Sequence, residues 1–515
     1  MTLKRMLEEV AGRYGDKAAI IQGNSRLSYT ELDRASNKVA NTLIKMGVNQ
    51  GDRVAMLLSN SPEFVTTFFG ITKIGASAAP LDIKYKADEL VSIFEDCQPS
   101  VLVSESPTLG KLVPLLPKFG SVRHVIDLSS RTKQFLSYEE ILATGSPDRI
   151  TAEPKPEDIA VIAYTAGPSL SPKGVMLPHH NFVMQSRVSA EGFEQTAEDK
   201  ALLFALPMHH AAGLTIVMLT SLGCASTVVM LPGLSMPGLT EVIEKERITV
   251  FIGVPFAFAL AARSAAEEGI KHDLSSLRLC ASGGAPLSLD TIEQFKQQFG
   301  RDLVNFWGLT EATAHVTCQA ANGSGAPGAV GRPLHGWQLK VVDDNDRELP
   351  VNHSGELIVK GLIMDGYYRH PQATDEVIKD DWLHTGDIGK IDEKGEVYIT
   401  GRKKDMVIIK GQNVFPGDIE DVLACHPKVA GVAALGIPDE MRGEVIGAVV
   451  KLKPGAAATE AEMKQFCLEH LAVYKIPKQV IFMDSLLETV TGKIDKEAIR
   501  SQLSLPPVFP RVTVP

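Results

Sequence analysis

The chain contains few cysteines and no cluster of basic residues. Its 6 cysteines are scattered without a C-x-x-C spacing, so neither a disulfide framework nor a thiolate zinc site is indicated, and reduced cysteines are expected. The 62 acidic and 52 basic residues give a formal charge of -10, and no run of lysine or arginine offers a footprint for nucleic acid. A polyanionic partner is therefore not expected.

Neither an export signal nor an uninterrupted apolar run that could span a membrane is expected from the sequence. Its first residues, MTLKRMLEEVAGRYGD, carry acidic side chains before any apolar run develops, which favours an amphipathic helix. Residues 211–240 contain no charged residue, but Gly, Pro, Ser and Thr interrupt them. We therefore expect a buried helix and strand there, no integral membrane segment, and a cytoplasmic location.

With 515 residues, of which 44% are hydrophobic, the chain can bury the cores of at least two domains. Helical spacing at 29–45 and 62–74 flanks a short strand at 52–58. Further short apolar runs alternate with helical stretches, which predicts an α/β fold with largely parallel sheets. These runs are 101–103, 159–164, 201–206, 226–231 and 250–254.

Two segments predict the domain organisation. Residues 339–360 change to short strands joined by turns, typical of a small barrel-like unit that closes the larger domain. The charged segment TGRKKD, Thr400–Asp405, has the composition of a linker, and a second strand and helix alternation follows it. We place one domain at residues 1–403 and a small α+β domain at 404–515, with a loose proline-rich tail at its end.

One glycine-containing loop has the composition of a phosphate site. The segment YTAGPSLSPKGV, Tyr164–Val175, follows an apolar strand and combines glycines, hydroxyl groups and a lysine. Backbone N–H groups and a cation of this kind can hold phosphates, although the loop lacks the Walker A pattern. Taken alone, the segment fits a polar surface loop equally well.

Further motifs follow in a fixed order: SGGAPLS at 282–288, FWGLTEAT at 306–313, WLHTGDIG at 382–389, GRKKD at 401–405 and TGKID at 491–495. With this ordered set, the chain resembles the acyl- and aryl-CoA synthetases of the adenylate-forming superfamily. That superfamily also contains luciferase and the adenylation domains of peptide synthetases. The resemblance extends from YTELDRASNKVANTL to TGKID, nearly the whole chain.

The resemblance implies a set of ATP-binding residues, which are carried over position by position. They are Thr165, Ser169, Lys173, Gly283, Gly284, Ala285, Trp307, Gly308, Thr310, Glu311, Asp387, Arg402 and Lys493.

Within that set, the loop residues would hold the β- and γ-phosphates, and the SGGA glycines would let the backbone approach adenine, on which Trp307 stacks. Thr310 would bond the α-phosphate and Glu311 would bind Mg²⁺, which prefers oxygen ligands. Asp387 would accept the ribose hydroxyl groups, with Arg402 beside it. Read alone, each of these residues would be an ordinary core, turn or surface residue.

The phosphate loop departs from the family, which usually has TSGTTG where this chain has TAGPSL. Pro168 removes a donor and fixes φ, and Leu170 disfavours a positive φ that glycine would allow. We expect a stiffer loop that grips phosphate differently.

The resemblance implies catalytic roles for Lys493, Thr310 and His210. Lys493 would offset the charge that builds when a carboxylate attacks the α-phosphorus. For the second step, Lys404 matches the hinge of a mobile C-terminal domain and Gly411 matches a glycine that lines the pantetheine tunnel. The residues assigned to CoA are Gly411, Tyr474, Lys475 and Lys478, of which the lysines could equally be surface charges.

By the same resemblance, the acid pocket is lined by His210, Ala211, Ala212, Gly213, Val254, Phe256 and Ala312. This small apolar lining favours a medium-chain, branched or aromatic acid and argues against a dicarboxylate. His315 either binds a second polar group of the acid or points elsewhere. His209 and His210 are adjacent and would diverge on regular structure, which argues against a metal pair.

These motifs together predict an ATP- and Mg²⁺-dependent carboxylic acid:CoA ligase that forms AMP and pyrophosphate. One alternative is an adenylating enzyme that loads a carrier protein, although no carrier domain is expected among these 515 residues. A second is a nucleotide-binding regulatory protein with weak turnover, and a third is a luciferase-like oxygenase. The sequence leaves open the acid, a homodimer and acetylation of Lys493.

Overall fold

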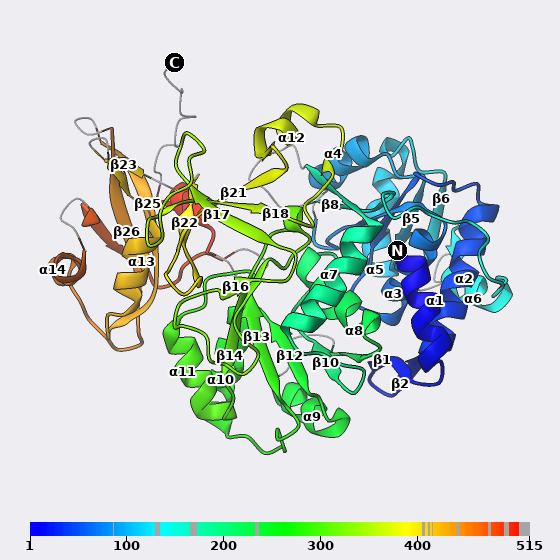
Figure 1. Ribbon diagram of the computed structural model, residues 1–515, viewed down its shortest axis with the longest axis horizontal. Coiled ribbons are helices and arrows are strands. Elements are labelled where there is room, and N and C mark those ends of the chain that lie inside the picture. Colours follow the sequence, from blue (N-terminus) through cyan, green and yellow to red (C-terminus); the bar gives the residue numbers. More distant parts are fainter. Residues whose placement is uncertain are drawn as a thin grey trace. The chain divides into compact units, whose positions relative to one another are not determined.

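The computed structural model describes residues 1–85, 87–128, 134–164, 173–231, 236–403, 407–409, 412–414, 416–439, 443–471, 475–488 and 494–503 (Figure 1). The contacts divide the chain into two compact units. Unit 1 comprises Met1–Leu339 and Val359–His384, and unit 2 comprises Lys340–Ile358 and Thr385–Pro515.

Unit 1 contains two sheets, and the strands of the first have the order β19-β9-β8-β4-β3-β5-β6-β7. The strands from β8 to β7 are parallel, whereas β9 and β19 are antiparallel to their neighbours. The bounds are β3 Arg53–Leu57, β4 Ser77–Pro80, β5 Val101–Ser104, β6 His124–Asp127, β7 Leu136–Ser137, β8 Ile159–Tyr164, β9 Gly174–Pro178 and β19 Gly366–Tyr367.

The second sheet of unit 1 has the order β16-β15-β14-β13-β12-β10-β11-β1-β2. The strands from β14 to β1 are parallel, so their carboxyl ends meet at one edge. The bounds are β1 Ala18–Gln22, β2 Ser25–Ser28, β10 Lys200–Leu203, β11 Thr227–Met230, β12 Val250–Gly253, β13 Leu279–Gly283, β14 Leu303–Trp307, β15 Thr317–Cys318 and β16 Arg332–Pro333.

Local sequence signals set the ends of the first helices. At α2 (Tyr29–Lys45), the Ser28 hydroxyl accepts from the Glu31 N–H while the Glu31 side chain accepts from the Ser28 N–H, a capping box. At α3 (Pro62–Lys73), Ser61 caps the helix and proline occupies the first turn. The helices expected at 29–45 and 62–74 are thus confirmed to within one residue.

The remaining helices of unit 1 connect the strands. They are α1 Leu3–Tyr14, α4 Ala87–Cys97, α5 Ser106–Leu112, η1 Val113–Lys118, α6 Tyr138–Thr144, α7 His179–Gly192, η2 Ala212–Leu219, α8 Thr220–Gly223, α9 Met236–Glu246, α10 Pro255–Glu268, α11 Leu289–Phe299, η3 Thr310–Ala312 and α12 Pro371–Val377.

The helices α10 and α11 lie beside the second sheet (Figure 1). An aromatic core fixes them there. Phe258 of α10 lies between Phe251 of β12 and Phe295 of α11, with ring centroids 4.5 and 5.1 Å away. Burial of one such phenylalanine side chain contributes about 3 kcal/mol. This core holds the strand ends, and therefore any site built on them, in fixed positions.

The uncharged residues 211–240 form a buried π-helix, η2, followed by α8, β11 and the start of α9. A buried helix and strand were expected there, and the residues described at these positions confirm both. Among the described residues, no helix combines the length and the apolar character needed to cross a membrane.

A smaller sheet has the order β17-β18-β21-β20, with β22 also paired to β21. Thr400, Gly401 and Arg402 lie in β22, and Gly401 and Arg402 pair with β21, so the linker predicted at Thr400–Asp405 is wrong for these three residues. The sheet was expected to close the larger domain, whereas the division between the units falls within β17, β18 and β21. The bounds are β17 Gln338–Val342, β18 Gly355–Lys360, β20 Ile378–Lys379, β21 Trp382–Ile391 and β22 Val397–Arg402.

The C-terminal part of unit 2 has the α+β composition expected from the sequence. Its sheet has the order β24-β23-β26-β25, with β27 parallel to β26. The boundary placed between residues 403 and 404 stays a prediction. The bounds are β23 Val407–Ile409, β24 Gln412–Val414, α13 Pro416–Ala424, β25 Val429–Asp439, β26 Gly443–Leu452, α14 Glu460–His470, β27 Gln479–Phe482 and α15 Lys496–Gln502.

Candidate functional site

The carboxyl ends of four neighbouring strands supply most of the predicted site residues of unit 1. His210 follows β10, Val254 follows β12, Gly284 follows β13 and Gly308 follows β14. Open α/β sheets bind ligands at this edge, because the loops there converge on one surface. The predicted residues that lie outside the described chain are Thr165, Ser169, Lys404, Gly411, Tyr474 and Lys493.

Lys173, Tyr367 and Glu311 lie close together at the beginning of β9. The Tyr367 hydroxyl donates to Glu311 Oε1 at 3.0 Å, and Lys173 Nζ lies 5.2 Å from the centre of the Tyr367 ring. Burial raises the pKa of Tyr367, and the negative charge of Glu311 raises it further, so the hydroxyl remains a donor. The predicted phosphate lysine and the predicted metal-binding carboxylate thus contact one intervening tyrosine.

Sequence analysis missed Tyr367, because no motif marks it. The pairing of β19 with β9 brings it opposite Val175, next to Lys173 in the chain. Only this long-range pairing could have revealed its role.

Backbone contacts fix the segment that carries Glu311. The Met364 N–H donates to the Glu311 carbonyl oxygen at 2.7 Å, and the Thr313 hydroxyl donates to the Leu362 carbonyl oxygen at 2.7 Å. Thr313 and Ala314 adopt positive φ angles of 51° and 81°, so the chain turns back sharply after η3. The carboxylate is therefore presented by a rigid turn.

The predicted adenine glycines have separate structural reasons. A Cβ atom on Gly283 would lie 2.4 Å from the Phe306 ring, and one on Gly308 would lie 2.0 Å from the Ala314 carbonyl oxygen. Gly284 is exposed and has a φ of +80°, which an alanine would adopt only with strain. Packing thus accounts for Gly283 and Gly308, and the adenine contact stays a prediction.

Trp307 and Thr310 flank Gly308. Trp307 is 9% exposed at the end of β14, where it is paired with Thr317 of β15, and Thr310 is partly buried at the start of η3. Neither the stacking of Trp307 nor the phosphate contact of Thr310 is tested here, and both stay predictions.

The predicted lining of the acid pocket is unevenly exposed. Ala312 is fully buried, whereas Phe256 at the start of α10 is 43% exposed. A Cβ atom on Gly213 would lie 2.3 Å from the Pro207 carbonyl oxygen, so packing requires that glycine. Ala211 is buried, and Ala212, Val254 and Ala285 are partly buried.

His315 is a core residue. Its ring stacks on Phe193 with 4.8 Å between centroids, and its Nδ1 lies 2.9 Å from the Ser189 hydroxyl oxygen. Burial lowers the pKa of His315 to about 3, so the ring is neutral. Of the two expectations, this packing favours a histidine that points away from the acid.

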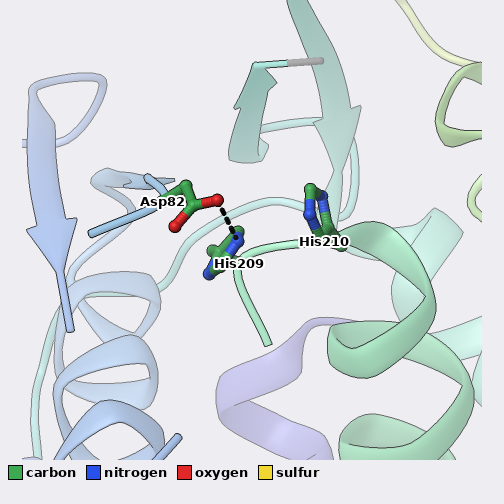
Figure 2. A group of neighbouring side chains, drawn as sticks. All are labelled: Asp82, His209 and His210. Carbon is green, nitrogen blue, oxygen red and sulfur yellow. Dashed lines mark ion pairs between the residues drawn. The ribbon is translucent and has the colours of Figure 1, made fainter. Parts of the chain in front are cut away.

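His209 and His210 lie in a turn before η2, near Asp82 (Figure 2). Their ring centroids are 4.4 Å apart, and His209 Nε2 lies 3.5 Å from Asp82 Oδ2. Burial alone would raise the pKa of Asp82, but the contact with His209 outweighs it, and the pKa falls to about 2. The argument that the two rings diverge assumed regular structure, which these residues do not have.

Unit 2 carries the predicted ribose residues as a cross-strand pair. Asp387 of β21 faces Arg402 of β22, and Arg402 Nε lies 2.5 Å from Asp387 Oδ1. Asp387 is 3% exposed. Of the predicted CoA residues, Lys475 pairs with Asp418 of α13 at 2.5 Å, and Lys478 is exposed.

The family model of the AMP-binding enzymes matches residues 7–368, and that of the AMP-binding enzyme C-terminal domain matches residues 418–493. The chain belongs to the AMP-binding enzyme family. The expected adenylate-forming superfamily and its α/β fold are thereby confirmed. The motifs at 282–288 and 306–313 of this AMP-binding enzyme lie within the first matched range, whereas those at 382–389 and 401–405 lie between the two ranges.

Known proteins resemble this AMP-binding enzyme over nearly its full length. A long-chain-fatty-acid–CoA ligase of Escherichia coli O6:H1 is 33% identical, over 97% of this chain and 94% of the relative. The ATP-bound structure of MatB from Rhodopseudomonas palustris has a TM-score of 0.89 at 30% identity and covers 98% of this chain and 99% of its own. The anthranilate CoA ligase AuaEII in complex with anthranoyl-AMP has a TM-score of 0.89 at 26% identity, over 98% and 97% of the two chains.

Proposed function

We propose that this AMP-binding enzyme is an ATP-dependent carboxylic acid:CoA ligase. It joins the acid to AMP with release of pyrophosphate, and then transfers the acyl group to the thiol of CoA with release of AMP. The observation that carries the proposal is the arrangement of Lys173, Tyr367 and Glu311 in a chain of this family. A cation and a carboxylate held in one place suit a metal-bound triphosphate.

The residues present fit Mg²⁺ at Glu311. The carboxylate supplies the hard oxygen ligand that the ion prefers, and only Oε1 accepts the hydrogen bond from Tyr367. Bound there, the ion would neutralise phosphate charge. Lys173 binds the terminal phosphates together with Thr165 and Ser169, and Tyr367 orients the carboxylate.

The adenosine part of ATP is assigned to the glycines at the end of β13, to Trp307, and to the pair of Asp387 and Arg402 in unit 2. The SGGA backbone approaches adenine and Trp307 stacks on it. Arg402 Nε contacts Oδ1 of Asp387, and this carboxylate is proposed to accept the ribose hydroxyl groups beside Arg402.

Charge neutralisation drives the first step in this proposal. The acid carboxylate and the α-phosphate are both anions, and Lys493 offsets their repulsion as the bond forms, with Thr310 on the α-phosphate. His210 lies beside the acid carboxylate. Loss of one such electrostatic group costs about 10²–10³ in rate.

The second step requires CoA to reach the acyl-adenylate. Rotation at Lys404 withdraws Lys493, and Gly411 leaves room for pantetheine. Tyr474, Lys475 and Lys478 meet the CoA nucleotide. Because Lys475 is paired with Asp418, it must exchange that carboxylate for a CoA phosphate.

We propose a medium-chain, branched or aromatic acid as the substrate. The small side chains of Ala211 and Ala212 beside His210 support this assignment, whereas Gly213 is accounted for by its packing against Pro207. The relatives include both a long-chain-fatty-acid–CoA ligase and an anthranilate CoA ligase, so aliphatic and aromatic acids both belong in the test.

Pyrophosphate release from Mg²⁺-ATP tests the function. We would assay short, medium, branched and aromatic acids, each with and without CoA. Release that CoA accelerates supports the ligase and ranks the acids, and Lys493→Ala should abolish it while thioester formation from supplied acyl-adenylate persists. Release without consumption of CoA favours the loading of a carrier protein. Tight ATP binding without release from any acid favours the regulatory protein.

Two further expectations are retained as proposals. A cytoplasmic location is supported by the scattered cysteines, and fractionation of cells would test it. A homodimer would be recognised by light scattering.

A further inference from the structure

Asp82, His209 and His210 form a side-chain cluster inside unit 1 (Figure 2). Asp82 follows β4 of the first sheet, and the two histidines follow β10 of the second sheet. One ligand atom from each residue lies within 4.8 Å of the others. Three donors from two distant segments, residue 82 and residues 209–210, thus lie close together.

The spacing is close to that of a metal site. Ligand bonds of about 2.1 Å place neighbouring donors of a tetrahedral zinc site about 3.4 Å apart. His209 Nε2 and Asp82 Oδ2 are already 3.5 Å apart. Rotation of the His210 ring, whose centroid lies 4.4 Å from that of His209, would complete the third corner.

The surrounding backbone holds these donors in place. The Lys84 N–H donates to Asp82 Oδ1 at 2.9 Å, which leaves Oδ2 directed at His209. Asn60 holds the other segment, since its Oδ1 accepts from the Met208 N–H and its Nδ2 donates to the Leu206 carbonyl oxygen, both at 2.8 Å. Such supporting contacts are typical of preorganised metal ligands.

The donor set selects the kind of ion. Two imidazole nitrogens and one carboxylate oxygen suit Zn²⁺ and related transition metals, whereas Mg²⁺ prefers an all-oxygen set such as Glu311 with phosphate. Three protein ligands leave a fourth position for water. The cluster and the nucleotide site would therefore take different ions.

We propose that Asp82, His209 and His210 bind a divalent transition-metal ion such as Zn²⁺, and that the bound ion inhibits the enzyme. The inhibitory part rests on the proposed function, in which His210 lies beside the acid carboxylate. An ion that holds the His210 ring removes it from that position. Acid activation then stops while ATP can still bind.

Direct binding tests the site without ATP or acid. The metal-free protein would be titrated with Co²⁺, whose visible absorption reports nitrogen and oxygen ligands, and with Zn²⁺ by calorimetry. We expect saturable binding of one ion, weakened at least about tenfold in Asp82→Asn and in His209→Gln. The control is His272→Gln, which removes a histidine 2.8 Å from Glu244 in an exposed pair and should leave binding unchanged.

Thermal melts of each variant identify any loss of fold, and a misfolded variant is replaced by Asp82→Ser or His209→Asn. Wild-type affinity equal to that of both cluster variants would overturn the site. An equal loss of metal affinity in His272→Gln would also overturn the site.

A second measurement tests inhibition. Zn²⁺ added at excess Mg²⁺-ATP should reduce pyrophosphate release by the wild type and by His272→Gln. The same concentration should inhibit Asp82→Asn and His209→Gln much less, relative to the metal-free rate of each. Binding without inhibition overturns the inhibitory part. If the protein binds the ion but releases pyrophosphate without any acid, the proposed function is refuted. The metal site itself is still supported in that case.

Discussion

The two units position their candidate residues by different means. In unit 1, Lys173, Glu311 and Tyr367 come from three segments, and they meet because β19 pairs with β9 and because η3, which follows β14 of the other sheet, packs against β9. In unit 2, Asp387 and Arg402 meet because two antiparallel strands place them directly opposite each other. The candidate residues of unit 1 are brought together by the strand topology, whereas those of unit 2 are brought together by the register of one strand pair.

This difference has an energetic counterpart. In unit 1 a carboxylate is held by a neutral hydroxyl, so its charge stays available to a ligand. In unit 2 a carboxylate is held by a cation, so a ligand must share it with that cation. We therefore expect substitutions in the first arrangement to affect the chemical step, and substitutions in the second to affect ATP affinity.

The largest effect is expected from Glu311→Gln. The amide keeps the size of the side chain but removes the charge that is proposed to hold the metal-bound triphosphate, so pyrophosphate release should fall about 10²–10³-fold. The control is Glu267→Gln, which breaks only the exposed pair with Arg263. Rates would be measured at saturating ATP, and a loss below tenfold would contradict the assigned role.

The next largest effect is expected from Asp387→Asn. The loss of a charged hydrogen-bond acceptor, worth about 1.5–3 kcal/mol, should raise the KM for ATP about 10–100-fold and change kcat little. Asp381→Asn, in the exposed pair with Lys360, serves as the control. If kcat falls as much as kcat/KM, the contrast between the two units disappears.

A smaller effect is expected from Tyr367→Phe, which keeps the ring over Lys173 and removes the hydroxyl. Because one hydrogen bond to a carboxylate is lost, kcat should fall about tenfold. Tyr398→Phe is a matched control in unit 2, since the Tyr398 hydroxyl donates to Asp392 at 3.3 Å near the surface. Equal losses in both variants would show that Tyr367 acts only through stability.

The effect that is smallest near neutral pH, and that grows as the pH falls, concerns the stability of unit 1. Burial lowers the pKa of His179 to about 4 and that of His315 to about 3, from 6.5. Both rings are neutral in the fold, whereas the unfolded chain takes up protons below pH 6.5. Stability is therefore fully present above that pH and declines as the pH falls towards these pKa values, by about 1.4 kcal/mol per histidine and pH unit.

Tryptophan fluorescence can follow this loss, because Trp307, Trp337 and Trp382 all lie in unit 1. Urea unfolding at pH values between about 7 and 5 should show the decline. His315→Gln should flatten it, and an unchanged slope would exclude His315 as a source.

The sequence allowed the local structure to be predicted well, but not the contacts between distant segments. The helices at 29–45 and 62–74 followed from helical periodicity and from caps such as Ser28 and Ser61, which are local signals. Tyr367 was missed because its position depends on the pairing of two short strands. Asp82 was missed as a partner of His209 because β4 and β10 belong to different sheets.

The predicted linker also shows the limit of local sequence signals. TGRKKD has the composition of an exposed connection, yet Thr400 to Arg402 continue a strand. The pairing of this segment with β21 determines that outcome, and the composition of the segment alone does not reveal the pairing. Local composition therefore predicted a break where a neighbouring strand imposed order.

The sharp turn from Gly308 to Ala314 has a consequence for engineering. Any side chain at Gly308 would collide with the Ala314 carbonyl oxygen, so this turn tolerates little variation. Phe256 at the start of α10 is 43% exposed and can be exchanged with little disturbance of the core. Because Phe256 and Val254 are proposed to line the acid pocket, a library aimed at new acids would randomise these two residues and keep the β14 turn constant.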